Sequence, residues 1–253
     1  MRKFDNKPNS NIISARLFER VPVKVYDCVT STNDVAKEWA KDGAVSGSTV
    51  VANSQTKGRG RRGRSFFSPS DSGVYFSVIL RPVCSGETSV LLTTATAVAV
   101  AQTIEELTGK TADVKWLNDV YVGGKKCGGI LTEAVFSGDG KLDSVIVGVG
   151  VNVTTVSFPD EFAVRAGSIG EVDKNKLVAS VVDKLIAFSK NLTNEHMDEY
   201  RRRCFVLGKK VTVSYGENLY DAKVKGVTDD GRLVVETNDG EKILYSEEVS
   251  LRL

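Results

Sequence analysis

The sequence predicts an α+β body followed by a small all-β domain. Two observations support this prediction. Segments with strand and helix character alternate as far as about residue 205, and from about residue 206 short strands follow one another with turn signals between them. A stretch rich in alanine, leucine and valine at 88–107 adds a long, mostly buried helix to the body. We therefore predict two domains, residues 1–205 and 206–253.

The predicted strands of the body are short segments of alternating or continuous apolar character. They cover residues 23–29, 48–54, 73–80, 111–116 and 144–153, with a hairpin over 120–135 that turns at Gly123-Gly124. The helices are predicted from apolar residues at helical spacing, and they cover 33–41, 88–107, 173–190 and 194–204. Ser31-Thr32 occupy the N-cap position of the first helix, and Gly43 is its stop signal.

The C-terminal domain is predicted from short strands between glycine-containing turns. The strands cover 211–215, 221–227, 231–236 and 242–245, and the turns cover 216–218, 229–231 and 238–240. Four or five strands in a span of about 48 residues fit a small β-barrel.

Composition and charge narrow the functional classes. The formal net charge is only +2 over 253 residues, which argues against a generally basic nucleic-acid-binding protein. The four cysteines are dispersed without a CxxC pair, so we expect free thiols in a reducing compartment. The N-terminus lacks the apolar core of a signal peptide, and no run of about 18 apolar residues occurs. We expect a cytoplasmic protein that makes no membrane contact.

Residues 57–64, Lys-Gly-Arg-Gly-Arg-Arg-Gly-Arg, are the most informative segment, and we call them the octet. Glycine lets backbone amides approach an anion closely, and arginine supplies planar donor pairs for phosphate or carboxylate. The octet has no apolar face, so we expect it to remain unburied, as a mobile anion-binding loop that orders on its ligand. The alternative is a disordered RNA-binding tract. Its position between two predicted strands favours the small-anion site.

Two further motifs carry polar side chains at strand ends. In Lys115-Trp-Leu-Asn-Asp119, Asn118 and Asp119 could hold Mg²⁺ together with a substrate phosphate, although a polar β-turn is the commoner reason for an Asn–Asp pair. In the second motif, Lys126 precedes Cys-Gly-Gly, and these small residues would let a ligand approach it. A solvated lysine on a surface hairpin is the alternative.

Other chemistries have little support. His196 is the single histidine, and we expect it to be a solvated surface residue, which leaves no basis for a Ser-His-Asp triad or a cysteine–histidine metal site. Gly148-Val-Gly150 lacks the third glycine and the following helix of a dinucleotide-binding fingerprint. Close packing in a buried strand explains these glycines better.

In order and spacing, the motifs resemble those of the biotin protein ligases, and the resemblance covers nearly the whole chain. The matching segments are Ser31-Thr-Asn33, Gln55, Gly58 to Arg64, Lys115 to Asp119, Lys126 to Ile130, Asn152 and Ser250-Leu-Arg252. The chain departs from the family pattern at Phe66, where tryptophan is usual, and at Leu117, where proline is usual. About thirty residues precede Ser31, too few for the family's N-terminal repressor domain, so we expect a ligase that does not bind DNA.

The resemblance implies a body with the class II aminoacyl-tRNA synthetase fold, a mixed sheet flanked by helices. It implies a set of biotin-binding residues: Ser31, Thr32, Asn33, Gln55, Arg59, Gly60, Arg61 and Lys126. It implies a set of ATP-binding residues: Gly58, Arg62, Gly63, Arg64, Asn118, Asn152 and Arg252. Lys126, Arg61 and Asp119 would be catalytic, with Asp119 holding Mg²⁺.

The implied activity is ATP-dependent formation of biotinyl-5′-AMP, followed by transfer of biotin to a lysine of a biotin carboxyl carrier protein. A homodimer is also implied, because family members often pair through their sheet. A lipoate protein ligase of the same fold is the nearest alternative, and an RNA-binding module using the octet is a more distant one. Phe158 and Phe162 are candidates for stacking on adenine, although each would more often be a core residue.

Overall fold

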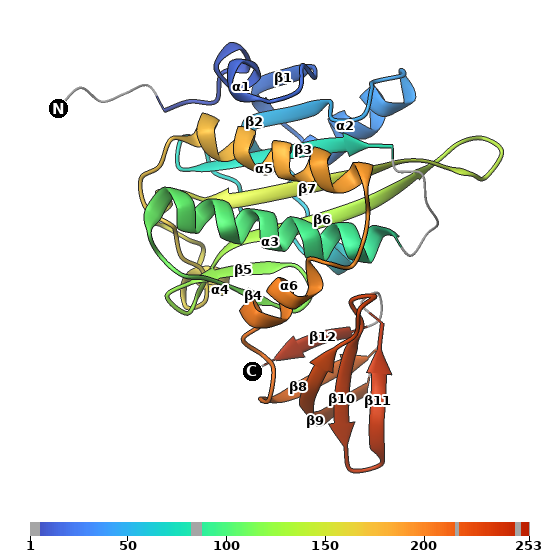
Figure 1. Ribbon diagram of the computed structural model, residues 1–253. Helices are drawn as coiled ribbons and strands as arrows, with labels where there is room; N and C mark the ends of the chain where they lie inside the picture. The colour runs from blue at the N-terminus through green and yellow to red at the C-terminus, as the bar shows by residue number, and fades with distance from the viewer. Residues whose placement is uncertain (1–5, 82–87, 216–217, 246–248, 253) are drawn as a thin grey trace.

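The structure is a computed structural model that describes residues 6–81, 88–215, 218–245 and 249–252 (Figure 1). The body contains seven strands: β1 (Val23–Val29), β2 (Thr49–Gln55), β3 (Gly73–Leu80), β4 (Ala112–Lys115), β5 (Asp119–Val122), β6 (Lys125–Phe136) and β7 (Leu142–Asn152). Its helices are α1 (Ser10–Arg16), α2 (Thr32–Lys41), α3 (Thr88–Thr108), α4 (Asp160–Ala163), α5 (Lys174–Lys190) and α6 (Met197–Arg203), with a 3₁₀ turn, η1 (Arg61–Gly63).

The seven body strands form one mixed sheet in the order β1-β2-β3-β7-β6-β5-β4. Only β1 and β2 run parallel, and every other neighbouring pair is antiparallel. The central strand, β7, is buried from Ser144 to Asn152, as expected for a strand that is paired and covered on both sides. The predicted α+β class with a mixed sheet and flanking helices is confirmed.

Helices cover both faces of this sheet. α3 and α5 lie together across one face, where alternate residues of β3 such as Phe76 and Val78 join the main core (Figure 1). On the other face, Ala36 and Ala40 of α2 pack against Ile79. By length and hydropathy α3 could span a membrane, but 67% of its apolar window is buried within the fold, as expected for a core helix.

The C-terminal domain is a five-stranded antiparallel sheet in the order β11-β10-β9-β8-β12. Its strands are β8 (Lys210–Tyr215), β9 (Asn218–Val227), β10 (Leu233–Thr237), β11 (Gly240–Leu244) and β12 (Val249–Arg252). Figure 1 shows this sheet beside α6 at one end of the body. The turn before β10 contacts the body directly, because the Trp116 indole donates to the carbonyl of Gly231 (2.9 Å). The boundary between residues 205 and 206 stays our proposal.

The predicted elements are confirmed with small shifts at their ends, whereas α1, α4, η1 and β12 were not predicted. Ser31 lies at the N-cap of α2, but its side chain makes no capping hydrogen bond. The predicted turn at 216–218 includes two residues outside the described part of the chain. Gly231 and Gly240 have positive φ, as their predicted turns require.

The prediction that His196 is a solvated surface residue is wrong. Its side chain is buried, with Nε2 2.7 Å from the Thr94 hydroxyl and its ring edge-to-face against Phe188. Burial lowers the pKa of His196 to about 4, so the ring stays neutral at neutral pH. Its place between α3 and α5 makes it a core residue.

Candidate active site

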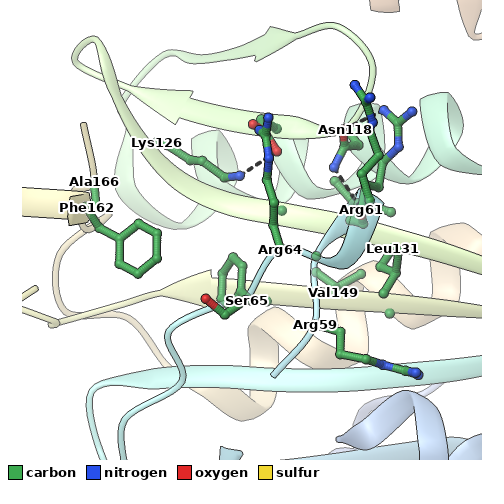
Figure 2. Close-up of a pocket in the computed structure, with 18 of the residues that line it drawn as sticks. Arg59, Arg61, Arg64, Ser65, Asn118, Lys126, Leu131, Val149, Phe162 and Ala166 are labelled. Carbon is green, nitrogen blue, oxygen red and sulfur yellow. Dashed lines mark hydrogen bonds and ion pairs between the residues drawn. The ribbon is translucent and has the colours of Figure 1, made fainter. Parts of the chain in front are cut away.

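A cleft of about 670 Å³ opens over one end of the sheet. The octet forms one wall, and β6 and β7 contribute Leu131 and Val149 to the cleft (Figure 2). The segment around α4 contributes a further wall, with Phe162 and Ala166. Residues from six separate parts of the chain therefore meet at one cleft, which the motifs alone could not show.

Most of the site residues expected from the sequence line this cleft. They are Ser31, Thr32, Asn33, Gln55, Arg59, Gly60, Arg61, Arg62, Arg64, Asn118, Asp119 and Lys126. The structure therefore brings most of the predicted site residues together at one cleft, while the role of each residue stays a prediction.

Three expected residues do not line the cleft. Gly58 is the buried residue of the octet, and a Cβ added to it would lie 2.6 Å from the Ser68 hydroxyl. Gly63 has a φ of +70° and shapes the turn after Arg62. The Asn152 amide donates to the carbonyl of Gly167 (3.1 Å) and so supports a neighbouring loop. The side chain of Arg252 lies outside what the structure describes.

The octet is folded into a compact loop. Arg59 and Ser65 form an isolated antiparallel bridge, and the amide of Gly60 donates to the carbonyl of Arg64 (2.7 Å). Most of the octet is exposed, as expected, and Gly60 and Arg61 are half-buried. The expectation is wrong for Gly58, which is buried because the chain at Phe66 and Ser68 lies against it.

The first arginine of the octet is directed away from the centre of the cleft. Arg59 forms ion pairs with Asp34 of α2 (2.6 Å) and Glu133 of β6 (3.0 Å), and Figure 2 shows its side chain leaving the other labelled arginines. These contacts fasten one end of the octet to the body. They support an anchoring role for Arg59 in place of the contact with biotin that the resemblance implies.

The cleft is strongly cationic. It is lined by seven cations, namely Arg59, Arg61, Arg62, Arg64, Lys115, Lys126 and Arg165, against the two carboxylates Asp119 and Glu161. Burial lowers the pKa of both Arg61 and Lys115, and the nearby charge of Asp119 opposes that shift. These cations have lost part of their hydration shell through burial, so the cleft favours an anionic ligand that would compensate their charge.

Lys126 and Arg61 are both held by the Asn118-Asp119 pair. The Lys126 ammonium lies 2.7 Å from Asp119 Oδ1, and Arg61 donates to Asn118 Oδ1 over 3.1 Å (Figure 2). Asn118 also donates to the carbonyl of Ile130 (2.9 Å), which fixes its amide. The pair thus positions two cations from different segments, a role that the polar-turn alternative did not include.

A magnesium ion would find one suitable carboxylate here. Asp119 is the acidic member of the predicted pair, and the Asn118 oxygen already accepts from Arg61. No cluster of three or more metal-ligating acidic, histidine or cysteine side chains occurs among the described residues. This donor set fits an ion held mainly by substrate phosphates, the usual arrangement for Mg²⁺.

Glycines in the central strands make room for the cleft. A Cβ on Gly150 would lie 2.5 Å from the Phe66 ring, and one on Gly148 would collide with the Asn33 side chain. Phe66 and Asn33 both line the cleft. The predicted close packing is confirmed, and the close neighbours are cleft side chains.

The sequence reasoning did not find the wall around α4. The backbone of Lys126 pairs with this segment. Its carbonyl accepts from the amide of Gly167 (2.9 Å), and its amide donates to the carbonyl of Arg165 (2.8 Å). Phe162 lines the cleft, whereas Phe158 packs against Phe67 with ring centroids 6.2 Å apart. The two phenylalanines were equal candidates in the sequence, and only Phe162 faces the cleft.

Comparison with known proteins points to one family. The model of the biotin/lipoate A/B protein ligase family matches residues 25–152, and that of the biotin protein ligase C-terminal domain matches 206–252. A bifunctional ligase/repressor of Bacillus subtilis is 35% identical over 237 residues, covering 89% of this chain and 73% of that protein. A biotin–[acetyl-CoA-carboxylase] ligase of Paracoccus denitrificans is 30% identical, covering 87% and 96%.

A solved structure is also similar. It is the biotin protein ligase of Aquifex aeolicus in complex with biotin and ATP, with 31% sequence identity and a TM-score of 0.78. The match covers 91% of this chain and 98% of that protein.

Proposed function

The chain belongs to the biotin/lipoate A/B protein ligase family, and on this premise we propose that it is a biotin protein ligase. It uses ATP to activate biotin and transfers the biotinyl group to a protein lysine. The observation that carries this proposal is the cleft itself, where a polar floor and an apolar wall adjoin a cluster of cations. Biotin offers these groups a polar ring system, an alkyl chain and a carboxylate, and ATP offers its phosphates.

The first half-reaction joins two anions. A carboxylate oxygen of biotin attacks the α-phosphorus of ATP, the bond from that phosphorus to the bridging oxygen breaks, and pyrophosphate leaves. No enzyme nucleophile is needed, and none of the described residues that line the cleft is a histidine or a cysteine. The protein must instead compensate the negative charge that gathers at the α-phosphate, and preorganised cations do this most effectively.

The cations differ in what they can reach. Lys126 lies at the boundary between the β6 strand and the α4 wall, so we assign it to the carboxylate and α-phosphate oxygens. Arg61 and Arg64 belong to the octet, and we assign them to phosphate. Asp119 keeps the Lys126 ammonium in place before substrates arrive. When bound, Mg²⁺ would neutralise further phosphate charge, and Asp119 is the residue proposed to hold it.

The second half-reaction releases AMP. The amine of an acceptor lysine attacks the carbonyl carbon of biotinyl-5′-AMP, the bond from that carbon to the phosphate oxygen breaks, and the nitrogen loses a proton. The acceptor is proposed to be a biotin carboxyl carrier protein, because the relative from Paracoccus denitrificans is named for that class of carboxylase. The octet, fastened by Arg59 at one end, covers the anhydride and limits its hydrolysis by water.

Three wider statements belong to the same proposal. The described cysteines are free thiols, as in a reducing compartment, which supports the proposed cytoplasmic location. β1 and β4 are the outer strands of the body sheet, and a homodimer would pair through such an edge. Residues 206–253 would form a separate domain that helps to hold ATP and the acceptor.

A competition between two acids separates biotin ligase from lipoate ligase, the nearest alternative. We expect the purified protein, given ATP, Mg²⁺ and a purified carrier domain, to attach labelled biotin. A hundredfold excess of lipoate should leave that labelling unchanged, because the cleft floor presents hydrogen-bonding groups that a dithiolane ring cannot use. Mass spectrometry of the carrier domain identifies the attached group. Attachment of lipoate in preference to biotin would overturn the assignment.

A further inference from the structure

A chain of hydrogen bonds runs beneath the floor of the cleft and ends at a carboxylate outside it. Glu133 Oε2 accepts from the Asn33 amide nitrogen over 2.7 Å. The Asn33 amide oxygen lies 2.6 Å from the Ser77 hydroxyl, which lies 2.8 Å from the Thr32 hydroxyl. Asn33 and Thr32 line the cleft, whereas Glu133 and Ser77 do not. Ser77 is fully buried, so no water competes for its hydroxyl.

The ionised carboxylate of Glu133 determines which group donates in each hydrogen bond between Glu133, Asn33 and Ser77. An ionised carboxylate only accepts hydrogen bonds, so the NH₂ group of Asn33 must face Glu133 and its oxygen must face Ser77. Ser77 has one proton, and it must donate that proton to Asn33. The Ser77 oxygen can then only accept from the Thr32 hydroxyl, which lies 2.8 Å away. The Gln55 amide oxygen, 3.2 Å from the same hydroxyl, is the other acceptor for its proton. With that proton donated to a neighbouring side chain, a lone pair of the Thr32 oxygen is left for a ligand.

Glu133 is held in its ionised form by its other contacts. Lys37 lies 2.6 Å from Oε1, and Arg59 lies 3.0 Å from Oε2. Burial acts to raise the pKa of Glu133, but hydrogen bonds from Lys37 and Asn33 outweigh it and keep the pKa below its usual value. The direction of the chain is therefore fixed at neutral pH.

We propose that Glu133 and Ser77 are positioning residues that set the hydrogen-bond polarity of the cleft floor, so that Thr32 accepts from an N–H group of the substrate. This inference rests on the proposed function, since the ureido ring of biotin supplies such N–H groups. Neither residue touches the substrate. A floor of reversed polarity would direct the Thr32 proton toward those N–H groups and weaken biotin binding.

Glutamine at position 133 keeps the direction of the chain while it removes the charge. Asn33 and Arg59 both donate to Oε2, whereas Lys37 alone donates to Oε1, so the glutamine oxygen takes the place of Oε2 and still accepts from Asn33. Alanine at position 133 leaves only the carbonyl of Leu131, 3.2 Å from the Asn33 nitrogen, to direct the amide.

The test is the Michaelis constant for biotin in biotin-dependent ATP–pyrophosphate exchange. We expect Glu133→Ala to raise the KM for biotin about tenfold, the loss of roughly one hydrogen bond, with a smaller rise for Glu133→Gln, which keeps the acceptor for Asn33. Ser77→Ala should also raise it several-fold, because the longer contact to the Gln55 oxygen, 3.2 Å, is then left to hold the Thr32 proton. The kcat and the KM for ATP should change less than twofold in all three variants.

Glu105→Gln is the matched control. Glu105 also pairs with an arginine, Arg203, at 2.7 Å, but it lies outside the cleft. The Glu105→Gln substitution should lower the midpoint temperature of thermal unfolding without changing the KM for biotin.

Two results would overturn the inference while leaving the ligase assignment intact. One is an unchanged KM for biotin in Ser77→Ala. The other is an equal rise for Glu133→Gln and Glu133→Ala, as expected if Glu133 acts only through its charge on Arg59 and the octet. A wild-type protein without biotin-dependent exchange would instead remove the proposed function, and this inference with it.

Discussion

Replacing Lys126 with alanine is expected to abolish nearly all biotin-dependent ATP–pyrophosphate exchange. Lys126 is the cation held by Asp119 at 2.7 Å, at the point where β6 pairs with the α4 wall. Without it, the carboxylate and the α-phosphate would meet with less charge compensation, and Asp119 would add an unpaired negative charge nearby. The loss of rate should be at least about a hundredfold to a thousandfold, as for the loss of one preorganised donor.

Lys125→Ala is the control for this experiment. Lys125 is the exposed neighbour on the same strand and does not line the cleft, so exchange should stay within about twofold of the wild type. A Lys126→Ala protein with undiminished exchange would remove Lys126 from the proposed chemistry. Retention of helix and sheet by circular dichroism would show that a loss of rate is not a loss of fold.

Replacing Arg61 with alanine should weaken adenylation by roughly 2–4 kcal/mol of transition-state stabilisation, a fall of about 30- to 1,000-fold in kcat/KM. Arg61 is half-buried, and its bond to Asn118 holds the guanidinium at the inner side of the octet. An arginine already desolvated and oriented has little reorganisation to undergo when phosphate charge develops. Single-turnover formation of biotinyl-5′-AMP measures this step directly.

Lys57→Ala provides the comparison within the octet. Lys57 is exposed and does not line the cleft, so its loss removes one positive charge without removing a cleft cation. If both variants lost the same modest activity, the octet would act through its overall charge, and the specific role of Arg61 would be wrong. A normal rate in Arg61→Ala would have the same meaning.

The parts of the fold that the sequence predicted are those fixed by local patterns. The central strand was predicted from its run of apolar residues and glycines, and the hairpin from Gly123-Gly124, both of which have positive φ. The site residues were predicted from the octet, the Asn118-Asp119 pair and Lys126, and the structure brings these segments together at one cleft. Charge and glycine placed together leave a signal in a short window of sequence.

The rest depends on contacts between distant segments. Burial of His196 comes from Thr94 and Phe188 on other helices, which nothing near residue 196 reveals. The wall at Phe162 forms because its loop pairs with Lys126, about forty residues away in sequence. Glu133 has its role only because Asn33, Lys37 and Arg59 converge on it.

The most direct test of the central claim is biotin-dependent ATP–pyrophosphate exchange by the purified wild-type protein with Mg²⁺. The proposed mechanism predicts exchange that requires biotin and is not supported by lipoate, because only the activated acid can return pyrophosphate to ATP. Absence of exchange with either acid would contradict the claim. The cationic cleft would then have to be tested as a contact surface for nucleic acid, through salt-dependent binding of RNA.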